Sequence, residues 1–153
     1  MSELSTFIRE SNRIEGITRP PLPREIKAHE ELLALETLDI DAIKAFVAKI
    51  APGKHLREHE GMDVRVGNHF PPQGGPFIPI NLMLILSDAS KGKHPYAIHL
   101  AYETLHPFMD GNGRSGRAIW LWQMIRQMHD PWVLKMGFLH KFYYQALAAS
   151  SER

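Results

Sequence analysis

The chain has 153 residues, of which 44% are hydrophobic, so it has room for one domain with its own core and not for two. It has no cysteine, which excludes disulfides, thiol catalysis and cysteine-ligated zinc. With 18 basic against 17 acidic side chains the net charge is +1, so overall charge does not favour nucleic acid or membrane binding, and any anion site must be local.

The N-terminal third is predicted to be helical. Apolar residues recur at helical spacing and Gly16 stands where a glycine ends a helix, which predicts a helix over about residues 5–15. The proline-rich TRPPLPRE segment joins this helix to the main body. Asp39 can cap a later helix that Pro52 and Gly53 end. The apolar side of that helix consists of Ile40, Ile43, Phe46, Val47 and Ile50.

The pattern then changes to that of a strand. Apolar residues alternate with polar residues or glycine from Met62 to Val66, and the PPQGGP segment provides a turn before Phe77 and Ile78. The alternation predicts a small β-hairpin over about residues 62–78.

Helical spacing returns after Pro79 and again after Pro95. The later segment RAIWLWQMIRQM is apolar on most of its circumference, so we expect a buried central helix that Pro131 ends. A last helix is predicted over about residues 132–149. The resulting fold class is mostly α, a helical bundle with one small β-hairpin, in a single domain over residues 1–153.

No segment approaches the roughly 20 apolar residues that cross a bilayer. The opening MSELSTFIRESNR also lacks the apolar run of a secretory signal. We therefore expect a cytoplasmic protein without a membrane partner.

The segment HPFMDGNGRSGR, from His106 to Arg117, carries the chemistry. Its glycines allow a tight turn and a close approach of the backbone to a ligand, and residues 112–114 open a helix whose free N–H groups favour anions. Arg114 and Arg117 are three residues apart, so both guanidiniums can reach one face and bind further phosphate oxygens. The segment therefore predicts a phosphate site.

Two residues indicate a reaction at that site. Asp110 would be repelled by phosphate unless a cation lay between them, so it is a candidate Mg²⁺ ligand. His106 precedes the loop, and the ordinary histidine pKa of about 6.5 suits a general base near neutral pH. Each feature alone has a structural explanation, as a turn, an exposed arginine pair or a structural histidine. Their occurrence together favours the functional interpretation.

HPFMDGNGRSGR matches without a gap the signature of the Fic domain family, His-x-Phe-x-(Asp/Glu)-Gly-Asn-Gly-Arg-x-x-Arg. The resemblance extends to the upstream VRVGNHFPP segment, which looks like the family's flap hairpin, and to the helix order over about residues 35–145. It implies the family's all-α core, with residues 106–117 as the signature loop. It also implies transfer of AMP from ATP to a hydroxyl side chain of a target protein.

The resemblance gives each matching residue a role. His106 would deprotonate the attacking hydroxyl, and Asp110 would hold Mg²⁺ on the α- and β-phosphates. Asn112 and the loop amides would bind the α-phosphate, and Arg114 and Arg117 would bind the outer phosphates. The implied nucleotide site consists of Gly111, Asn112, Gly113, Arg114 and Arg117.

A second match lies near the N-terminus. SNRIEG, from Ser11 to Gly16, resembles the family's inhibitory motif, which is Ser or Thr, three residues, Glu, then Gly or Asn. Glu15 in the last turn of a helix opposes the helix dipole, which a nearby cation would offset. The resemblance implies Arg117 as that cation, so that the pair would remove the arginine that the γ-phosphate needs. The structural alternative is a surface glutamate beside a terminal glycine.

By the same resemblance, the predicted hairpin would dock the target protein by strand addition. The target would present a Ser, Thr or Tyr hydroxyl, and its identity is not encoded in any motif. A homo-oligomer that modifies itself is a further expectation, whereas nucleic acid is not expected as a partner. The docking residues would be Asn68, His69, Phe70, Phe77 and Ile78.

Two other motifs are disfavoured by their context. GNGRSG fits the dinucleotide-binding fingerprint, which must follow a strand, yet residues 95–105 have helical period. HLREH, residues 55–59, fits a zinc pattern that needs a continuous helix, which the neighbouring glycines and proline shorten. Tyr143 and Tyr144 suit either contact with an adenine or ordinary packing.

The sequence thus predicts an autoinhibited Fic-type protein adenylyltransferase that uses ATP and Mg²⁺. Two alternatives within the enzyme class stay open, namely removal of AMP from a modified protein and transfer of another phosphate-containing group. Outside that class, the alternatives are a catalytically silent nucleotide-binding module and a regulatory partner that presents its hairpin to proteins.

Overall fold

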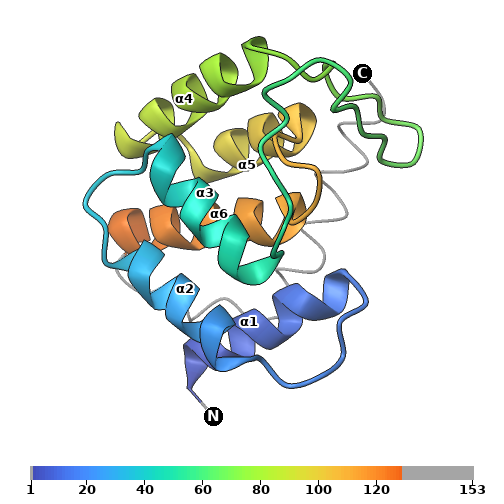
Figure 1. Ribbon diagram of the computed structural model, residues 1–153. Helices are drawn as coiled ribbons and strands as arrows, with labels where there is room; N and C mark the ends of the chain where they lie inside the picture. Colours follow the sequence, from blue (N-terminus) through green and yellow to red (C-terminus); the bar gives the residue numbers. More distant parts are fainter. Residues whose placement is uncertain (1, 129–153) are drawn as a thin grey trace.

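The computed structural model describes residues 2–128, and this part of the chain is mostly helical (Figure 1), which confirms the predicted fold class. The predicted last helix, about 132–149, and Tyr143 and Tyr144 lie outside the described residues. The described helices are α1 (Glu3–Ile14), α2 (Pro23–Leu33), α3 (Ile40–Ile50), α4 (Phe77–Ser90), α5 (Pro95–Leu105) and α6 (Asn112–Met128).

The helices begin where the sequence supplies their caps. The Ser2 hydroxyl and the Asp39 carboxylate each accept a hydrogen bond from the N–H three residues on, at the starts of α1 and α3. Pro23 and Pro95 occupy the first turns of α2 and α5, where a missing N–H costs nothing. Within residues 2–128, no helix combines the length and apolar character needed to span a bilayer.

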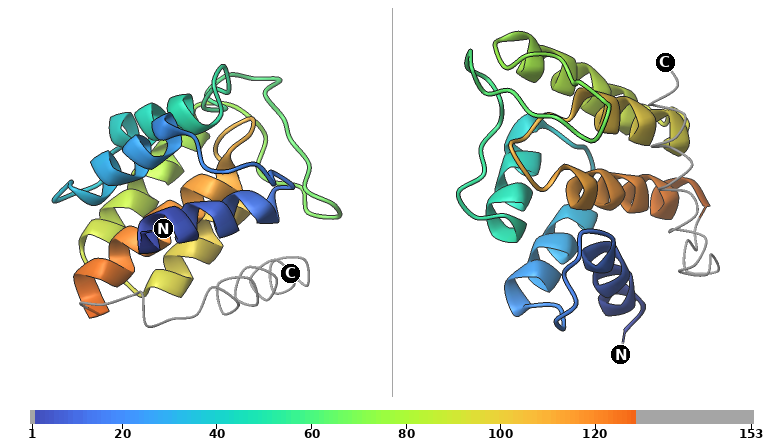
Figure 2. Two further views of the ribbon diagram at one scale, coloured as in Figure 1. Left: turned by 90° about the horizontal axis from the view of Figure 1, so that it is seen from below. Right: turned by 90° about the vertical axis from the view of Figure 1, so that its right-hand side faces the viewer.

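α6 is the centre of the fold. It contacts every other described helix, and α5 most extensively. Figures 1 and 2 show it running between α4 and α5 on one side and α1 and α2 on the other. Its residues are buried from Asn112 to Met124, which confirms the buried central helix predicted from RAIWLWQMIRQM.

Buried apolar side chains of the described residues form two clusters. The larger one joins α2, α3, α4 and α5 to one part of α6, through residues such as Ile43, Leu82 and Ile119. The smaller one attaches α1 to α6, and in it the rings of Phe7 and Trp120 stack with their centroids 6.5 Å apart. α1 therefore has its own apolar contact surface. The smaller cluster contains Phe7, Ile8, Trp120, Leu121 and Met124.

The prediction of a two-stranded hairpin over residues 62–78 is wrong. Within this segment the backbone has one isolated antiparallel bridge, between Val66 and His69, whose two N–H···O distances are 3.0 and 2.9 Å. The alternating apolar residues are only half-buried. Residues 62–72 form a loop, and the carbonyls of Met62 and Pro72 at its two ends accept hydrogen bonds from the buried guanidinium of Arg57 instead of from a neighbouring strand. The alternation therefore reflects the packing of this loop.

Phe77 and Ile78 start α4 instead of ending a hairpin, and Pro79 lies in the first turn of this helix, as its sequence position predicts. Pro76 stands at the N-cap position, where its missing N–H costs no helical hydrogen bond. Ile78 is 0% exposed, so it cannot contact a target protein, whereas Phe77 is 72% exposed.

Candidate active site

The signature loop connects α5 to α6, and two of its residues, His106 and Gly111, have positive φ angles. His106 has φ 51° and is the one non-glycine residue with positive φ in the described part of the chain. Its N–H still bonds to the Tyr102 carbonyl at 2.9 Å, as the C-cap of α5. Gly111 has φ 84°, and a Cβ there would also lie 3.2 Å from the Ala51 side chain. The turn into α6 therefore requires glycine.

Asn112 closes this loop with its side chain. Its Oδ1 accepts a hydrogen bond from the Phe108 N–H, and its Nδ2 donates to the Phe108 carbonyl, both at 2.8 Å. Phe108 is 1% exposed and anchors the loop in the core. Because the amide group is used in this way, the groups available to an anion are the N–H groups of residues 112–114, which the first turn of α6 leaves without helical partners.

A short antiparallel bridge supports the loop. Leu56 pairs with Phe108. The N–H groups of Arg57 and Met109 donate across this pair to the opposite chain at 2.8 and 3.0 Å. The signature loop is thus attached to the segment that follows α3.

The His106 imidazole lies in a mostly buried position. Its Nδ1 is 4.0 Å from Oε2 of Glu103, one turn earlier on α5. Burial lowers the pKa of His106 to about 4, and the charges of Arg57 and His69 add to this, against the opposing effects of the Glu103 carbonyl and Glu15. The imidazole is therefore neutral at pH 7, the form that can accept a proton.

Glu103 is a polar residue of this site that was not identified from the sequence. Burial raises the pKa of Glu103 to about 8, against the opposing charge of Arg117, so its carboxyl is neutral at pH 7. It faces Gly116, where a Cβ would lie 2.5 Å from Oε1. The signal available in the sequence was its position three residues before His106, on the same side of a helix.

The two arginines of the signature contact different parts of the protein. Arg114 Nη1 donates to the Ile50 carbonyl at the end of α3, at 2.8 Å. Arg117 points to α1, where Nε donates to Ser11 Oγ at 2.8 Å and Nη2 to the Ser11 carbonyl at 2.9 Å. Arg117 Nη2 also lies 2.6 Å from Oε2 of Glu15. Both guanidiniums lie beside the start of α6, but they do not share a partner.

Glu15, the C-cap of α1, lies against the N-terminus of α6. A Cβ on Gly113 would lie 2.6 Å from Oε2 of Glu15, so the glycine makes room for this carboxylate. A helix N-terminus favours negative charge. The Glu15 carboxylate thus lies where the sequence predicts a phosphate, against Arg117.

Asp110 is exposed, and its Oδ1 accepts a hydrogen bond from the Gly111 N–H at 2.7 Å. An exposed carboxylate beside a phosphate site suits Mg²⁺, which takes one or two carboxylates and completes its shell with phosphate oxygens and water. Among residues 2–128, no three His, Cys, Asp or Glu side chains converge as a metal site of their own.

The loop over 62–72 contains the remaining predicted docking residues. Phe70 is 68% exposed, and the Arg65 guanidinium lies 4.7 Å from the centre of its ring. Asn68 is exposed as well, at the tip of the loop. His69 has a structural contact, because its Nε2 lies 2.9 Å from the Thr104 carbonyl of α5.

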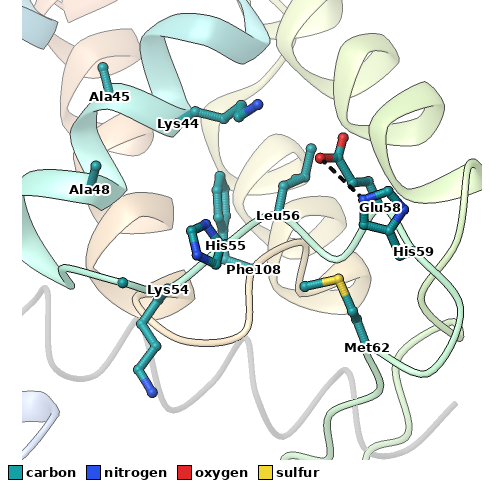
Figure 3. A pocket seen from close by; sticks show the side chains of 11 residues that line it. Lys44, Ala45, Ala48, Lys54, His55, Leu56, Glu58, His59, Met62 and Phe108 are labelled. Atoms are coloured by element: carbon teal, nitrogen blue, oxygen red, sulfur yellow. Dashed lines mark ion pairs between the residues drawn. The ribbon is translucent and has the colours of Figure 1, made fainter.

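A cavity of about 590 Å³ lies between α3 and the segment over residues 53–62. Phe108 lines it, but the predicted nucleotide-binding residues do not. His55 and His59 of the HLREH motif also face it (Figure 3), and residues 55–59 form no helix, so they lack the geometry of the zinc motif. The lining residues are Lys44, Ala45, Ala48, Gly53, Lys54, His55, Leu56, Glu58, His59, Met62 and Phe108.

Comparison with known proteins identifies the family. The model of the Fic/DOC family matches residues 35–124, which is more than half of the chain and includes the whole signature loop. The chain belongs to the Fic/DOC family. Ser11 and Glu15 lie outside the matched range, so the family match does not bear on α1.

Three relatives carry the name protein adenylyltransferase Fic. The one from Culex quinquefasciatus is 31% identical over 98 residues, which is 56% of this chain and 19% of the relative. Those from Drosophila persimilis and Drosophila pseudoobscura pseudoobscura are each 30% identical over 107 residues, 59% of this chain and 20% of the relative. The match therefore spans about a fifth of the relatives' length. No solved structure matches the chain.

Proposed function

We propose that this Fic/DOC protein is a protein adenylyltransferase that moves AMP from Mg-ATP to a hydroxyl side chain of a target protein, and that Glu15 restrains it. The observation that carries this proposal is the signature loop. It presents the unused N–H groups of a helix N-terminus to an anion, with a buried arginine beside them and a neutral imidazole at its entrance. The names of the three relatives support the same reaction.

The triphosphate would bind at the start of α6. The N–H groups of residues 112–114 would contact the α-phosphate, and Arg114 and Arg117 would contact the outer phosphates once they exchange their present partners. Asp110 would hold Mg²⁺, which neutralises phosphate charge when bound. These residues contribute by positioning and charge, which is what nucleotidyl transfer demands.

His106 would act as the general base. Its Nδ1 faces Glu103, so Nε2 is the nitrogen that would take the proton of the target hydroxyl. The hydroxyl oxygen would then bond to the α-phosphorus, and the bond from that phosphorus to the oxygen bridging to the β-phosphate would break. Pyrophosphate leaves, and the target carries AMP.

The Glu15–Arg117 pair would compete with ATP. The carboxylate lies 2.6 Å from Arg117 Nη2, so a γ-phosphate and Glu15 cannot both use that guanidinium. Glu15 also lies against Gly113, where the triphosphate would enter. Activity would require Glu15 to leave, through removal of its carboxylate or movement of α1.

The target would dock on the 62–72 loop and the start of α4. Phe70 and Phe77 are exposed there and would contact a target protein that presents a Ser, Thr or Tyr hydroxyl. A second copy of this chain is one such target, which would make self-modification concentration-dependent.

Labelled ATP tests the proposal. Wild type, Glu15→Gly and Glu15→Gly with His106→Ala are incubated with Mg²⁺, a cell lysate and ATP labelled on either the α- or the γ-phosphate. We expect α-label on protein, more in Glu15→Gly and none in the double variant. Label from the γ-phosphate would indicate kinase-like transfer, and absence of label with retained ATP binding would favour a silent nucleotide-binding module.

Glu10→Gln is the matched control for the inhibitory part of the proposal. Glu10 lies on the same helix and, among the residues that the structure describes, forms ion pairs with Arg9 and Arg13 only, so this variant should label protein at the wild-type level. Its counterpart is Glu15→Gln, which likewise removes only the charge. Equal gains from the two variants would show that α1 acts through its overall charge instead of through the pair of Glu15 with Arg117.

A further inference from the structure

Arg57 is a completely buried arginine, 0% exposed, between the 62–72 loop and the C-terminal end of α5. Its guanidinium donates to four main-chain carbonyls in two separate parts of the chain. The acceptors are His106 from Nε at 2.7 Å, Leu105 from Nη2 at 2.8 Å, and Met62 and Pro72 from Nη1 at 3.1 and 2.8 Å.

A buried charge is costly unless it is paired or fully hydrogen-bonded. No carboxylate lies within ion-pair distance of Arg57 among the described residues, and burial lowers the pKa of Arg57, against the more distant charge of Asp63. The four carbonyls therefore have to offset the burial of the guanidinium. The guanidinium spreads five N–H donors over three nitrogens in a rigid plane, whereas a lysine ammonium has three donors on one nitrogen and cannot reach all four carbonyls.

Two of the four carbonyls belong to Leu105, which ends α5, and to His106, which follows it. The last carbonyls of a helix have no partner within the helix, and Arg57 supplies one for Leu105 and one for His106. His106 is left-handed, a conformation that persists only where its surroundings determine it. Its N–H bonds to Tyr102 and its carbonyl to Arg57, so the main chain is held on both sides of the imidazole.

The other two carbonyls close the loop that contains Phe70. Met62 and Pro72 lie at its two ends, and both accept from the same nitrogen, Nη1. A second contact, from His69 to the Thr104 carbonyl, joins the middle of the loop to α5.

We propose that Arg57 is a positioning residue that couples the 62–72 loop to the main chain of His106. One guanidinium sets the surface on which a target would dock in a defined relation to the imidazole that would accept its proton. The consequence for catalysis rests on the proposed function, whereas the coupling itself is a property of the fold and is measured without activity.

Hydrogen exchange tests the coupling. In Arg57→Lys, amides over both 62–75 and 103–110 should exchange about tenfold faster or more, because the lysine leaves most of the four carbonyls unpaired. Amides in α6 should be unchanged. Arg65→Lys is the matched control, since Arg65 lies in the same loop and, within residues 2–128, its guanidinium donates only to Gly67. The 103–110 amides of this variant should stay protected. Protection of 103–110 in Arg57→Lys would overturn the proposal.

The pKa of His106 gives a second readout, by NMR titration of its imidazole. In Arg57→Lys the pKa should rise toward the ordinary 6.5, because looser packing admits water to a ring whose pKa is lowered chiefly by burial. A pKa equal to that of the wild type would contradict the coupling.

If Arg57→Lys does not fold, hydrogen exchange of the wild-type protein still tests the coupling. In low denaturant, the amides of His69, Gly75 and His106 should exchange through one opening with a common free energy and denaturant dependence, because Arg57 joins their surroundings. Separate openings for the loop and for His106 would overturn the proposal.

The catalytic consequence is measured in the Glu15→Gly background. Arg57→Lys should lower kcat for AMP transfer and leave the dissociation constant of ATP unchanged, because Arg57 contacts none of the residues from 111 to 117. Weaker ATP binding in proportion to the loss of kcat would contradict a positioning role. Failure of Glu15→Gly itself to transfer AMP would refute the proposed function, and the exchange experiments would still decide the coupling.

Discussion

At the scale of single residues, His106 determines how the rate of AMP transfer is expected to depend on pH. Its pKa lies near 4 because the ring is buried, so lowering the pH from neutrality should not protonate it until well below the ordinary 6.5. Removing Glu15 would not reverse this, because the Glu15 charge raises the pKa of His106.

We therefore expect kcat/KM of the Glu15→Gly variant to stay level from about pH 8 to about pH 6 and to fall only at lower pH. A pH–rate profile for AMP transfer at limiting substrate measures this. An acidic limb with its midpoint at 6.5 or above would contradict the buried, neutral imidazole.

Glu103 is expected to make the free energy of unfolding decrease as the pH rises. Its pKa is about 8 in the folded protein and about 4.3 in the unfolded chain, so between these values the folded state binds more protons and its stability falls as the pH rises. Glu103→Gln removes this dependence. Its stability relative to wild type should increase steadily from pH 5 to about pH 8, measured by urea unfolding.

Comparing Glu103→Gln with the wild type isolates the contribution of Glu103 to the pH dependence of stability. His29 and His99 are buried with their pKa values lowered to about 4, so they destabilise the fold as the pH falls from about 6.5 toward 4, but they do so equally in both proteins. A difference between Glu103→Gln and wild type that did not vary with pH would show that the carboxyl is ionised in the folded state.

The signature residues could be found from the sequence because they are contiguous and their spacing alone brings them together. Arg57 could not, and for Glu103 the spacing indicates only that it lies on the same side of the helix as His106. Arg57 reaches His106 only through the bridge between Leu56 and Phe108, and Glu103 matters because α5 packs closely on α6 at Gly116. These contacts depend on the tertiary fold, to which local spacing gives no access.

At the scale of elements, α1 connects stability to the site. It is held to α6 by the smaller apolar cluster and ends with Glu15 against Arg117. Loosening the cluster should therefore weaken the ion pair as well.

Phe7→Ala should cost about 3–5 kcal/mol in unfolding free energy and also tighten ATP binding, because α1 then leaves Arg117 more readily. Urea unfolding and calorimetric titration with Mg-ATP measure the two effects. Phe46→Ala is the control, since Phe46 is equally buried but belongs to the larger cluster, and it should lose stability without a gain in ATP affinity. The same gain in both variants would indicate general loosening.

The sequence predicted the helices better than the loop between α3 and α4. Caps such as Asp39 and prolines such as Pro95 act locally, so they mark helix starts whatever the rest of the fold does. The 62–78 segment alternates like a strand, but its carbonyls bond to the Arg57 side chain, which no local pattern reveals. The predicted edge for strand addition is accordingly reduced to the single Val66–His69 bridge.

At the scale of the whole molecule, the fold gathers three separate segments around the start of α6. The end of α1 supplies Glu15, the end of α5 supplies His106, and the 62–72 loop lies beside α5 (Figure 1). α6 contacts every other described helix, so the helices that end with Glu15 and with His106 both pack against it. The Fic/DOC match covers the last two segments, and α1 adds a contact outside it.

The balance of the reaction is the most direct test of AMP transfer. Glu15→Gly is incubated with Mg-ATP and a protein lysate, and the pyrophosphate released is compared with the AMP that becomes bound to protein. We expect one pyrophosphate for each AMP, and neither product when His106→Ala is added. Release of inorganic phosphate in place of pyrophosphate, or AMP bound to protein at an undiminished rate without His106, would contradict it.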